Sequence, residues 1–315
     1  MTAGKRRELR RPLSRARTRQ AWLLLAPAVV VLAVTAAWPL FRTIAYGWTD
    51  ANLSTLDQAR SVGFDNYLAR DRDGTWVGLL ADHEWWRAVW NTFRFAIISV
   101  ALEVCLGIAI ALVLDCSFRL RGWVRAAVLI PWAIPTVVSA KLWTLLLSGE
   151  LGAVNDLLAT VGLIHAPIGW TSDPDLVMVS IIIVDVWKTT PFVAILVLAA
   201  LQTVPRSCYE AARLDGIAAT TVLFRITLPL IRPALTVAIV FRLLDAMRVF
   251  DVVYVLTGNT TDTMTMSIFA RQQLVDFQEI GYGSAASTLL FVIVGLFTAV
   301  YLRVVRSDRD GANAR

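Results

Sequence analysis

The chain has few of the residues that proteins use for metal binding and thiol chemistry. Among its 315 residues are three cysteines, two histidines and three lysines. No two cysteines have the CxxC spacing, and the two histidines, His83 and His165, lie in different parts of the chain. Neither a disulfide framework nor a zinc site is therefore expected.

Charge is also scarce. Only 17% of the residues are charged and 57% are hydrophobic, with a mean hydropathy of +0.62. A soluble domain carries roughly 25% charged residues, and a disordered chain combines low hydrophobicity with high charge. This composition therefore argues against both a soluble enzyme and a disordered protein.

The net charge of +6 comes from one end of the chain. The first twenty residues hold eight Lys and Arg and one acid, so that the remaining chain is nearly neutral. A nucleic-acid-binding protein would show a basic patch across its folded body. We therefore expect no nucleic acid partner.

Long apolar runs are abundant. A transmembrane helix needs about 20 mostly apolar residues, and six stretches qualify: Ala21–Ala45, Val89–Leu114, Val124–Leu147, Leu176–Leu201, Pro233–Leu256 and Ser284–Val305. The first could be a signal peptide, but the apolar core of a signal peptide has only about 7–15 residues. The sequence thus predicts an all-α membrane protein with six transmembrane helices within residues 21–305.

The basic residues indicate the orientation of these spans. If the N-terminus is cytoplasmic, the segments on that side hold nineteen Lys and Arg, against five on the other side. Cytoplasmic loops carry such an excess. Both termini are therefore predicted to be cytoplasmic, with tails at residues 1–20 and 306–315 and an internal loop at 202–232.

The internal loop carries the most specific motif. Pro205 is suited to a helix start, Gly216 permits a sharp break, and Pro229 and Pro233 predict the end of a second short helix. A small bent helical element on the cytoplasmic face would serve to bind a protein partner. The residues of its pattern are Glu210, Ala211, Ala212, Gly216, Ile226, Leu228 and Pro229.

This pattern resembles the signature of permease subunits of bacterial ABC importers, and every spacing matches. The resemblance runs from about residue 20 to 305 and implies the type I importer, or MetI-like, permease fold. In that family the loop is a coupling helix that docks in a groove on the ATPase subunit. The resemblance assigns this role to the residues of the pattern and to Asp215.

Two flanking segments are similar to maltose/trehalose-type sugar permeases. They are residues 185–192, around Asp185 and Pro191, and residues 241–258, from Phe241 to Gly258. The implied function is import of a sugar, most specifically a disaccharide such as trehalose or maltose, across the bacterial cytoplasmic (inner) membrane. An extracytoplasmic sugar-binding protein would deliver the solute.

The chain has no nucleotide-binding loop of its own. A P-loop ends in Gly-Lys-Ser/Thr, whereas Gly4-Lys5 is followed by Arg6. The chain is therefore predicted to be a transport subunit and not an enzyme, without a cofactor. The resemblance implies two copies of an ATPase that binds ATP and Mg, together with a second, different permease chain in the same membrane.

Charged residues inside the spans leave two interpretations open. Four charged residues in the fifth stretch recur every third position and are expected on neighbouring faces of one helix: Arg242, Asp245, Arg248 and Asp251. Such groups either pair structurally at a subunit interface or line a polar cavity that binds sugar hydroxyls. The candidate substrate-pathway residues are Asp185, Trp187, Lys188, Asp245, Arg248, Asp251 and Tyr254.

The same sequence features are compatible with other functions. Arg242, Arg248 and Lys188 would suit a phosphorylated solute such as glycerol phosphate. An ion-coupled secondary transporter is a further alternative, although many carry inverted repeats, which the sequence does not show. A membrane hydrolase would need a nucleophile with a base, or a His/Glu metal motif, and neither is present.

Overall fold

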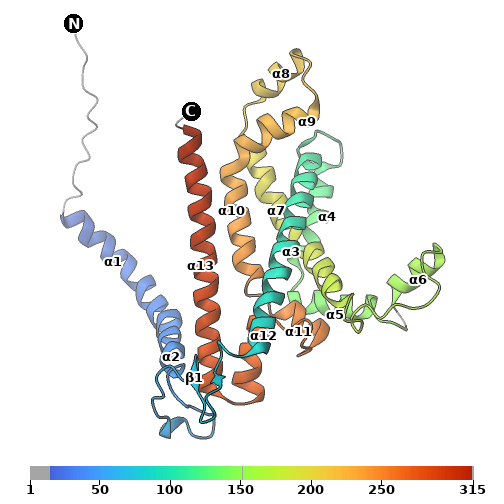
Figure 1. The fold of residues 1–315 in the computed structure, drawn as a ribbon. Helices are drawn as coiled ribbons and strands as arrows, with labels where there is room; N and C mark the ends of the chain where they lie inside the picture. The colour runs from blue at the N-terminus through green and yellow to red at the C-terminus, as the bar shows by residue number, and fades with distance from the viewer. Residues whose placement is uncertain (1–14, 151, 314–315) are drawn as a thin grey trace.

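The structure, a computed structural model, describes residues 15–150 and 152–313, with side chains described for 19–150 and 152–303. Within these residues the chain is almost entirely helical (Figure 1). The one sheet in this part of the chain is a two-stranded antiparallel hairpin, β1 (Ala69–Arg70) with β2 (Trp76–Val77). The predicted tail at residues 1–20 lies mostly outside the described residues.

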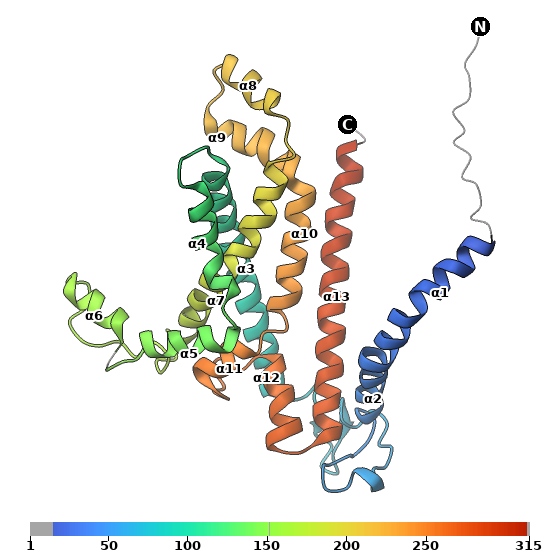
Figure 2. The same ribbon diagram turned by 180° about the vertical axis from the view of Figure 1, so that it is seen from behind.

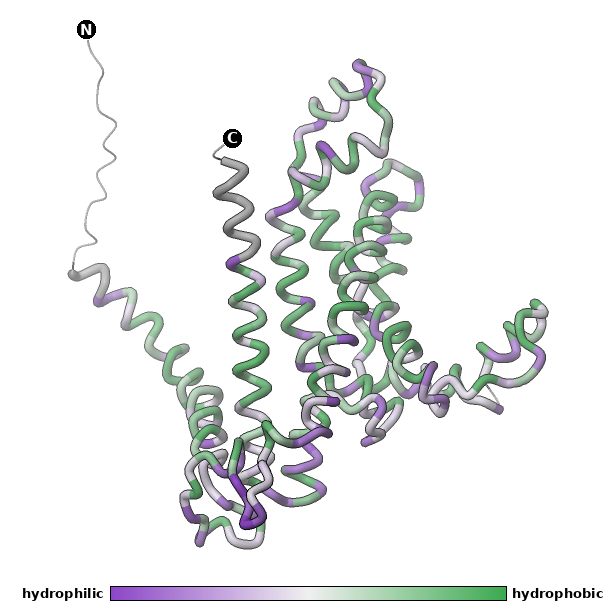
Figure 3. Tube along the Cα trace, in the orientation of Figure 1, coloured by the Kyte–Doolittle hydropathy of each residue, from purple (hydrophilic) through white to green (hydrophobic). Residues whose placement is uncertain are grey.

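Five helices in the described part of the chain are long and apolar enough to cross a membrane. Apolar residues follow them along most of their length (Figure 3). Each corresponds to one predicted stretch. They are Arg19–Tyr46, composed of α1 (Arg15–Leu32), the π-helical turn Ala33–Ala37 and α2 (Trp38–Tyr46); α3 (His83–Asp115); α7 (Val177–Leu201); Ala219–Ala246; and Ile280–Arg303 of α13 (Ile280–Asn313).

The third predicted span is broken. Helices α4 (Arg121–Ala133) and α5 (Thr136–Leu146) meet at an angle of 92°. Pro135 disfavours the helical conformation for the residue before it, and Ile134 is accordingly extended, with ψ 134°. The prediction of one helix over Val124–Leu147 is therefore wrong, and the described residues hold six spans if the bent pair is counted as one.

The fifth predicted span ends early. Helix α10 (Leu228–Ala246) stops before Met247, and a separate helix, α11 (Asp251–Thr257), follows after a short turn. Arg248 closes α10, since its Nε donates to the Leu244 carbonyl at 3.0 Å. Lys and Arg commonly satisfy the last carbonyls of a helix in this way. The prediction of one helix over Pro233–Leu256 is wrong, and Asp251 does not share a helix with Arg242.

The connecting segments gather at the two ends of the bundle (Figures 1 and 2). One end carries the start of α1, the end of α13, and the helices α8 (Arg206–Leu214) and α9 (Ala219–Val222). The opposite end carries the hairpin, α12 (Met266–Arg271) and the short helical turns Leu56–Gln58 and Gln272–Asp276, and α6 (Ala153–Thr160) projects sideways beyond α5. The internal loop at 202–232 thus lies at one end, and the side of the membrane that each end faces stays a prediction.

Helices α3 and α7 form the centre of the bundle, with α10 packed against both. Gly107 of α3 lies directly against Val193 of α7: a Cβ at Gly107 would meet Val193 Cγ1 at 2.7 Å and the Ala194 nitrogen at 3.2 Å. Small residues at such positions let helix backbones approach closely in membranes. The contact fixes the position of α7, which carries several of the candidate pathway residues.

Replacing Gly107 with valine is expected to destabilise the protein by about 1–3 kcal/mol, the usual effect of overpacking. The measurement is the thermal stability of the purified assembly in detergent. Gly295→Val in α13 is the matched control, because nothing lies within 4 Å of a Cβ there. Equal stability of the two variants would contradict the close packing of α3 and α7.

Candidate functional site

The internal loop is built around Gly216. Helix α8 ends at Leu214, and Gly216 has a φ of +66°. The Gly216 N–H donates to the Arg213 carbonyl at 3.1 Å, and the Ile217 N–H donates to the Ala212 carbonyl at 3.0 Å. These two bonds define a Schellman motif, which requires a left-handed residue at this position and strongly favours glycine. The sharp break predicted at Gly216 is present.

The loop presents its motif residues to the surface. Glu210, Ala211, Asp215, Gly216 and Pro229 are exposed, Ile226 and Leu228 are half-buried, and only Ala212 is buried. Beside them, Leu214 is 89% exposed and Phe224 is 67% exposed. The element thus carries apolar side chains at its tip, with a glutamate and an aspartate next to them, and this combination is typical of a protein-docking surface.

The second helix of the loop does not end at its prolines. Residues Ala219–Ala246 form one continuous helix that passes through both Pro229 and Pro233. A π-helical turn, Leu223–Thr227, comes immediately before α10, and the Leu228 N–H bonds to the Leu223 carbonyl. Pro229 then falls in the first turn of α10, where its missing N–H costs least. The predicted termination at these prolines is therefore wrong.

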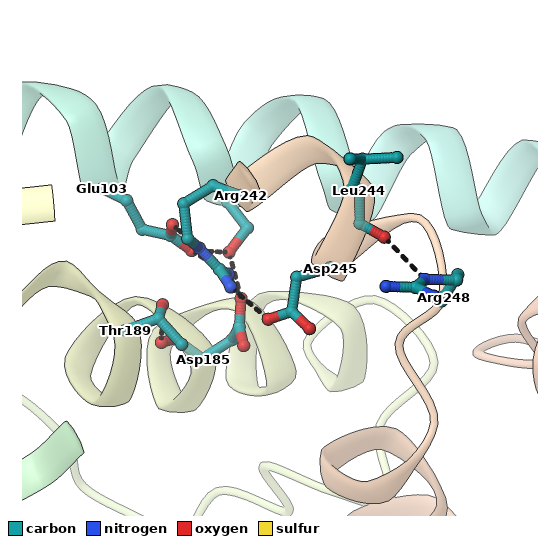
Figure 4. Close-up of polar contacts among 8 residues, drawn as sticks. Glu103, Asp185, Thr189, Arg242, Leu244, Asp245 and Arg248 are labelled. Carbon is teal, nitrogen blue, oxygen red and sulfur yellow. Dashed lines mark hydrogen bonds and ion pairs between the residues drawn. The ribbon is translucent and has the colours of Figure 1, made fainter. Parts of the chain in front are cut away.

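A buried cluster of charges joins α3, α7 and α10 (Figure 4). Arg242 of α10, only 4% exposed, is its centre. Its Nε and Nη2 donate to the two oxygens of Glu103 at 2.5 and 2.8 Å. Nη2 also donates to Asp185 Oδ2 at 3.2 Å, and Nη1 donates to Asp245 Oδ2 at 2.5 Å. One guanidinium therefore binds three carboxylates from three helices.

Glu103 of α3 was not among the predicted site residues, although it is fully buried and makes the bidentate contact with Arg242. Ser99, one turn earlier, lies 2.9 Å from Glu103 Oε1 and 2.6 Å from Asp185 Oδ2. An acid within an apolar span usually faces protein or water. That single acid in the second span was the available signal, but no local partner at helical spacing pointed to Arg242.

A cavity of about 500 Å³ opens beside this cluster, between α4, α5, α7, α10 and α11. Five of the seven predicted pathway residues line it: Asp185, Lys188, Asp245, Arg248 and Asp251. Arg242 also lines the cavity, together with four aromatic residues: Trp132, Phe192, Phe241 and Phe250. The cavity therefore combines charged groups with flat apolar faces.

The other two predicted pathway residues lie outside the lining. Trp187 packs edge-to-face against Trp143 of α5, with ring centroids 5.5 Å apart. Tyr254 stacks on Phe250 at 5.1 Å, and the Arg271 guanidinium lies 4.7 Å from the Tyr254 ring centroid. Both aromatic rings thus hold helices together in this structure.

Among the described residues, no group of three or more His, Cys, Asp or Glu side chains is placed to hold a metal ion. The carboxylates of the charge cluster are directed at Arg242 instead. The arrangement suits electrostatic stabilisation and hydrogen bonding to a solute.

The sequence matches one family model, described as a binding-protein-dependent transport system inner membrane component, over residues 103–309. A trehalose/maltose transport permease, MalF of Thermococcus litoralis, is 39% identical over 92% of this chain and 94% of its own length. The sulfoquinovosyl glycerol transport permease SmoG of Agrobacterium fabrum is 35% identical over 90% of each chain. The trehalose transport permease SugA of Mycobacterium tuberculosis is 35% identical over 94% of this chain and 92% of its own.

Solved structures of similar fold are also ABC transporters. A chain of a bacterial ABC transporter that imports the acidic polysaccharide alginate superposes with a TM-score of 0.77, covering 93% of this chain at 23% identity. A chain of the same kind of transporter, crystallised with an alginate-bound periplasmic protein, gives 0.76. The MetNI methionine transporter gives 0.52 over 70% of this chain. At these identities the likeness concerns the fold alone.

Proposed function

Because the chain belongs to the family of binding-protein-dependent transport system inner membrane components, we propose that its cavity conducts a neutral disaccharide such as trehalose or maltose. The chain is a multi-pass inner-membrane permease subunit of an ABC importer, and it is not an enzyme. The identity of the solute is the proposed part. It draws support from the trehalose and maltose relatives and from the chemistry of the cavity.

The observation that carries the proposal is the balance of charge around the cavity. Three acidic residues, Asp185, Asp245 and Asp251, face three basic ones, Lys188, Arg242 and Arg248. Two of the cations are already engaged, since Arg242 binds carboxylates and Lys188 Nζ donates to the Ile134 carbonyl at 2.8 Å. An anionic solute would therefore find few cations available. A neutral, hydroxyl-rich solute needs none.

Hydroxyl groups would find acceptors in the same cavity. Asp245 has an exposed side chain, although one of its oxygens is held by Arg242, and Asp251 is exposed at the start of α11. Their carboxylate oxygens can accept hydrogen bonds from sugar hydroxyls, and hydrogen bonds to charged groups are stronger than neutral ones. The exposed rings of Trp132 and Phe241 offer apolar faces for the sugar C–H surface.

Transport in this proposal depends on other subunits. An ABC permease of this family works with ATPase subunits and a binding protein. We place the ATPase, in two copies that bind ATP and Mg, at the α8 loop around Glu210 and Gly216. A second, different permease would complete the pathway. The end of the bundle that carries α8 and the end of α13 would then face the cytoplasm, and the binding protein would dock at the opposite end.

The proposal is tested by uptake into proteoliposomes. The complete importer, with its own binding protein in saturating amount, is supplied with labelled trehalose or maltose and with ATP inside the vesicles. ATP-dependent accumulation of a disaccharide, unaffected by excess glycerol phosphate or an acidic oligosaccharide, supports the proposal. Preferred uptake of either anionic solute would overturn it, and uptake that follows an ion gradient without ATP would favour a secondary transporter.

Replacing Asp251 with alanine is expected to lower the maximal uptake rate about fivefold, corresponding to one lost hydrogen bond of about 1 kcal/mol. Asp156→Ala is the matched control: both aspartates are exposed in the first turn of a short helix. Asp156 does not line the cavity. Equal uptake rates in the two variants would remove Asp251 from the solute pathway.

A further inference from the structure

The break between α4 and α5 leaves backbone groups without helical partners. The last carbonyls of any helix have none within the helix, and Pro135 has no N–H to offer. In a membrane span such groups have no bulk water and must be satisfied by protein or by a water-filled cavity. Ile134, extended between the two helices, carries one of these carbonyls.

Lys188 supplies the donor. Its side chain runs from the middle of α7 and is 8% exposed, and Nζ lies 2.8 Å from the Ile134 oxygen. Asp185, one turn earlier on the same helix, is engaged by Arg242. A buried ammonium is costly, and it is usually kept for a specific partner. Here that partner is the main chain at the break.

Two ring contacts fix the arms of the bend on either side of this bond. Phe192 of α7 stacks on Trp132 of α4, with centroids 6.2 Å apart and an interplanar angle of 25°. Trp187 of α7 packs on Trp143 of α5 at 5.5 Å. Lys188 therefore occupies the centre of a three-point attachment of the bent span to α7.

The same attachment forms a wall of the cavity. Trp132, Thr136, Lys188 and Phe192 all line it, and they come from both arms of the bend and from α7. A change in the angle between α4 and α5 would therefore change the shape of the cavity directly. Among the described contacts, the Lys188–Ile134 hydrogen bond is the only one in which a charged side chain binds the backbone at the break.

We propose that Lys188 is a positioning residue that holds the α4–α5 break at its observed bend, and that this bond is loosened and re-formed as the cavity opens and closes during transport. The inference about the bend stands on the geometry of this chain. Only the transport part rests on the proposed function.

The test measures the bend itself. Spin labels are placed at two exposed positions on either side of the break, Ile130 and Leu142. They are measured in the complete importer, with the three cysteines of this chain replaced by serine. Lys188→Met removes the donor and retains the length of the side chain. It is expected to broaden the label-to-label distance distribution and shift its mean, whereas Lys188→Arg should restore the distribution of the parent.

The chain offers a matched control. Lys141 is an exposed lysine on α5, and Lys141→Met should leave the distance distribution unchanged. Lys188→Gln, which keeps a donor without the charge, is measured in parallel and carries the test if the methionine variant fails to assemble. An intermediate distribution is expected for it.

Uptake provides a second readout. Lys188→Met is expected to lower the maximal transport rate about tenfold, consistent with losing one hydrogen bond to a charged donor. The solute concentration that gives half-maximal uptake should stay unchanged. A distance distribution identical to that of the parent overturns the role at the bend. A changed distribution with a parental transport rate overturns the role in transport. The distances require no solute, so they remain decisive even if disaccharide uptake is not observed.

Discussion

Replacing Arg242 with glutamine is expected to abolish assembly of a functional permease. Arg242 is the cation in contact with Glu103, Asp185 and Asp245, and the first two of these carboxylates are buried. Removing one partner of a buried ion pair costs about 3–5 kcal/mol, because the remaining charge is left uncompensated. Native stability is typically only about 5–15 kcal/mol, so this loss is a large fraction of the total.

Glutamine cannot replace the guanidinium at this site. Arg242 uses Nε, Nη1 and Nη2 together, and its contact with Glu103 is bidentate. A neutral amide has fewer donors and no charge to offset three carboxylates. We therefore expect mutual repulsion of Glu103 and Asp185 to separate α3 from α7, the two helices at the centre of the bundle.

The measurement is the yield and thermal stability of the intact importer extracted from membranes. Arg271→Gln is the control: its pair with Asp276, at 2.7 Å, is partly exposed, and an exposed pair contributes about 0–1 kcal/mol. Adding Asp185→Asn to Arg242→Gln should recover part of the yield, since it removes one unpaired charge. A parental yield and melting temperature for Arg242→Gln alone would contradict the role of the cluster.

Replacing Gly216 with valine is expected to uncouple ATP hydrolysis from transport. A left-handed conformation costs a side-chain-bearing residue about 1–2 kcal/mol, and it is least accessible to a β-branched one. The Schellman bonds of Gly216 and Ile217 would then break, and the exposed Leu214 would leave its present position. Because each 1.4 kcal/mol is a factor of ten in an equilibrium, docking of the loop should weaken about tenfold.

Gly216→Asn separates two causes of this effect. Asparagine adopts the left-handed conformation more readily than other residues, and nothing within 4 Å of Gly216 would obstruct its Cβ in the isolated chain. If backbone conformation is decisive, the asparagine variant retains uptake and the valine variant loses it. Loss in both variants would indicate that a partner approaches the glycine closely. Normal coupled transport in both would refute docking at this loop.

The local features of the loop were predictable from the sequence. Gly216 and Pro205 act on their own backbone and on the next few residues, so the end of α8 and its glycine turn follow from composition and spacing. The prolines further on were misread because Pro229 lies at the start of α10, where proline is tolerated, and Pro233 lies within the helix without ending it. The π-helical turn Leu223–Thr227 that places Pro229 there has no recognisable sequence pattern.

The breaks within the spans were predicted less well. Hydropathy over about 20 residues reports whether a segment is apolar, and it does not register a change of direction inside that segment. The segment around Ile134–Pro135 is apolar enough to be read as one span. The fifth stretch was read through its turn although Arg248 and Asp251 lie there. Pro135 was a local signal for the first break. The second depends on Arg248 reaching back to the Leu244 carbonyl.

What the sequence determined by itself is the set of apolar segments, the side of the membrane favoured by the basic residues, the pattern of the internal loop and the lack of a P-loop. All of these depend on neighbours along the chain. The tertiary structure alone decided that Glu103 meets Arg242, that Lys188 meets Ile134, and that Trp187 and Tyr254 turn to other aromatic rings. Apart from the ring pair Phe250–Tyr254, these contacts join distant segments. They exist only because α3, α5, α7 and α10 pack at particular angles, which no local pattern specifies.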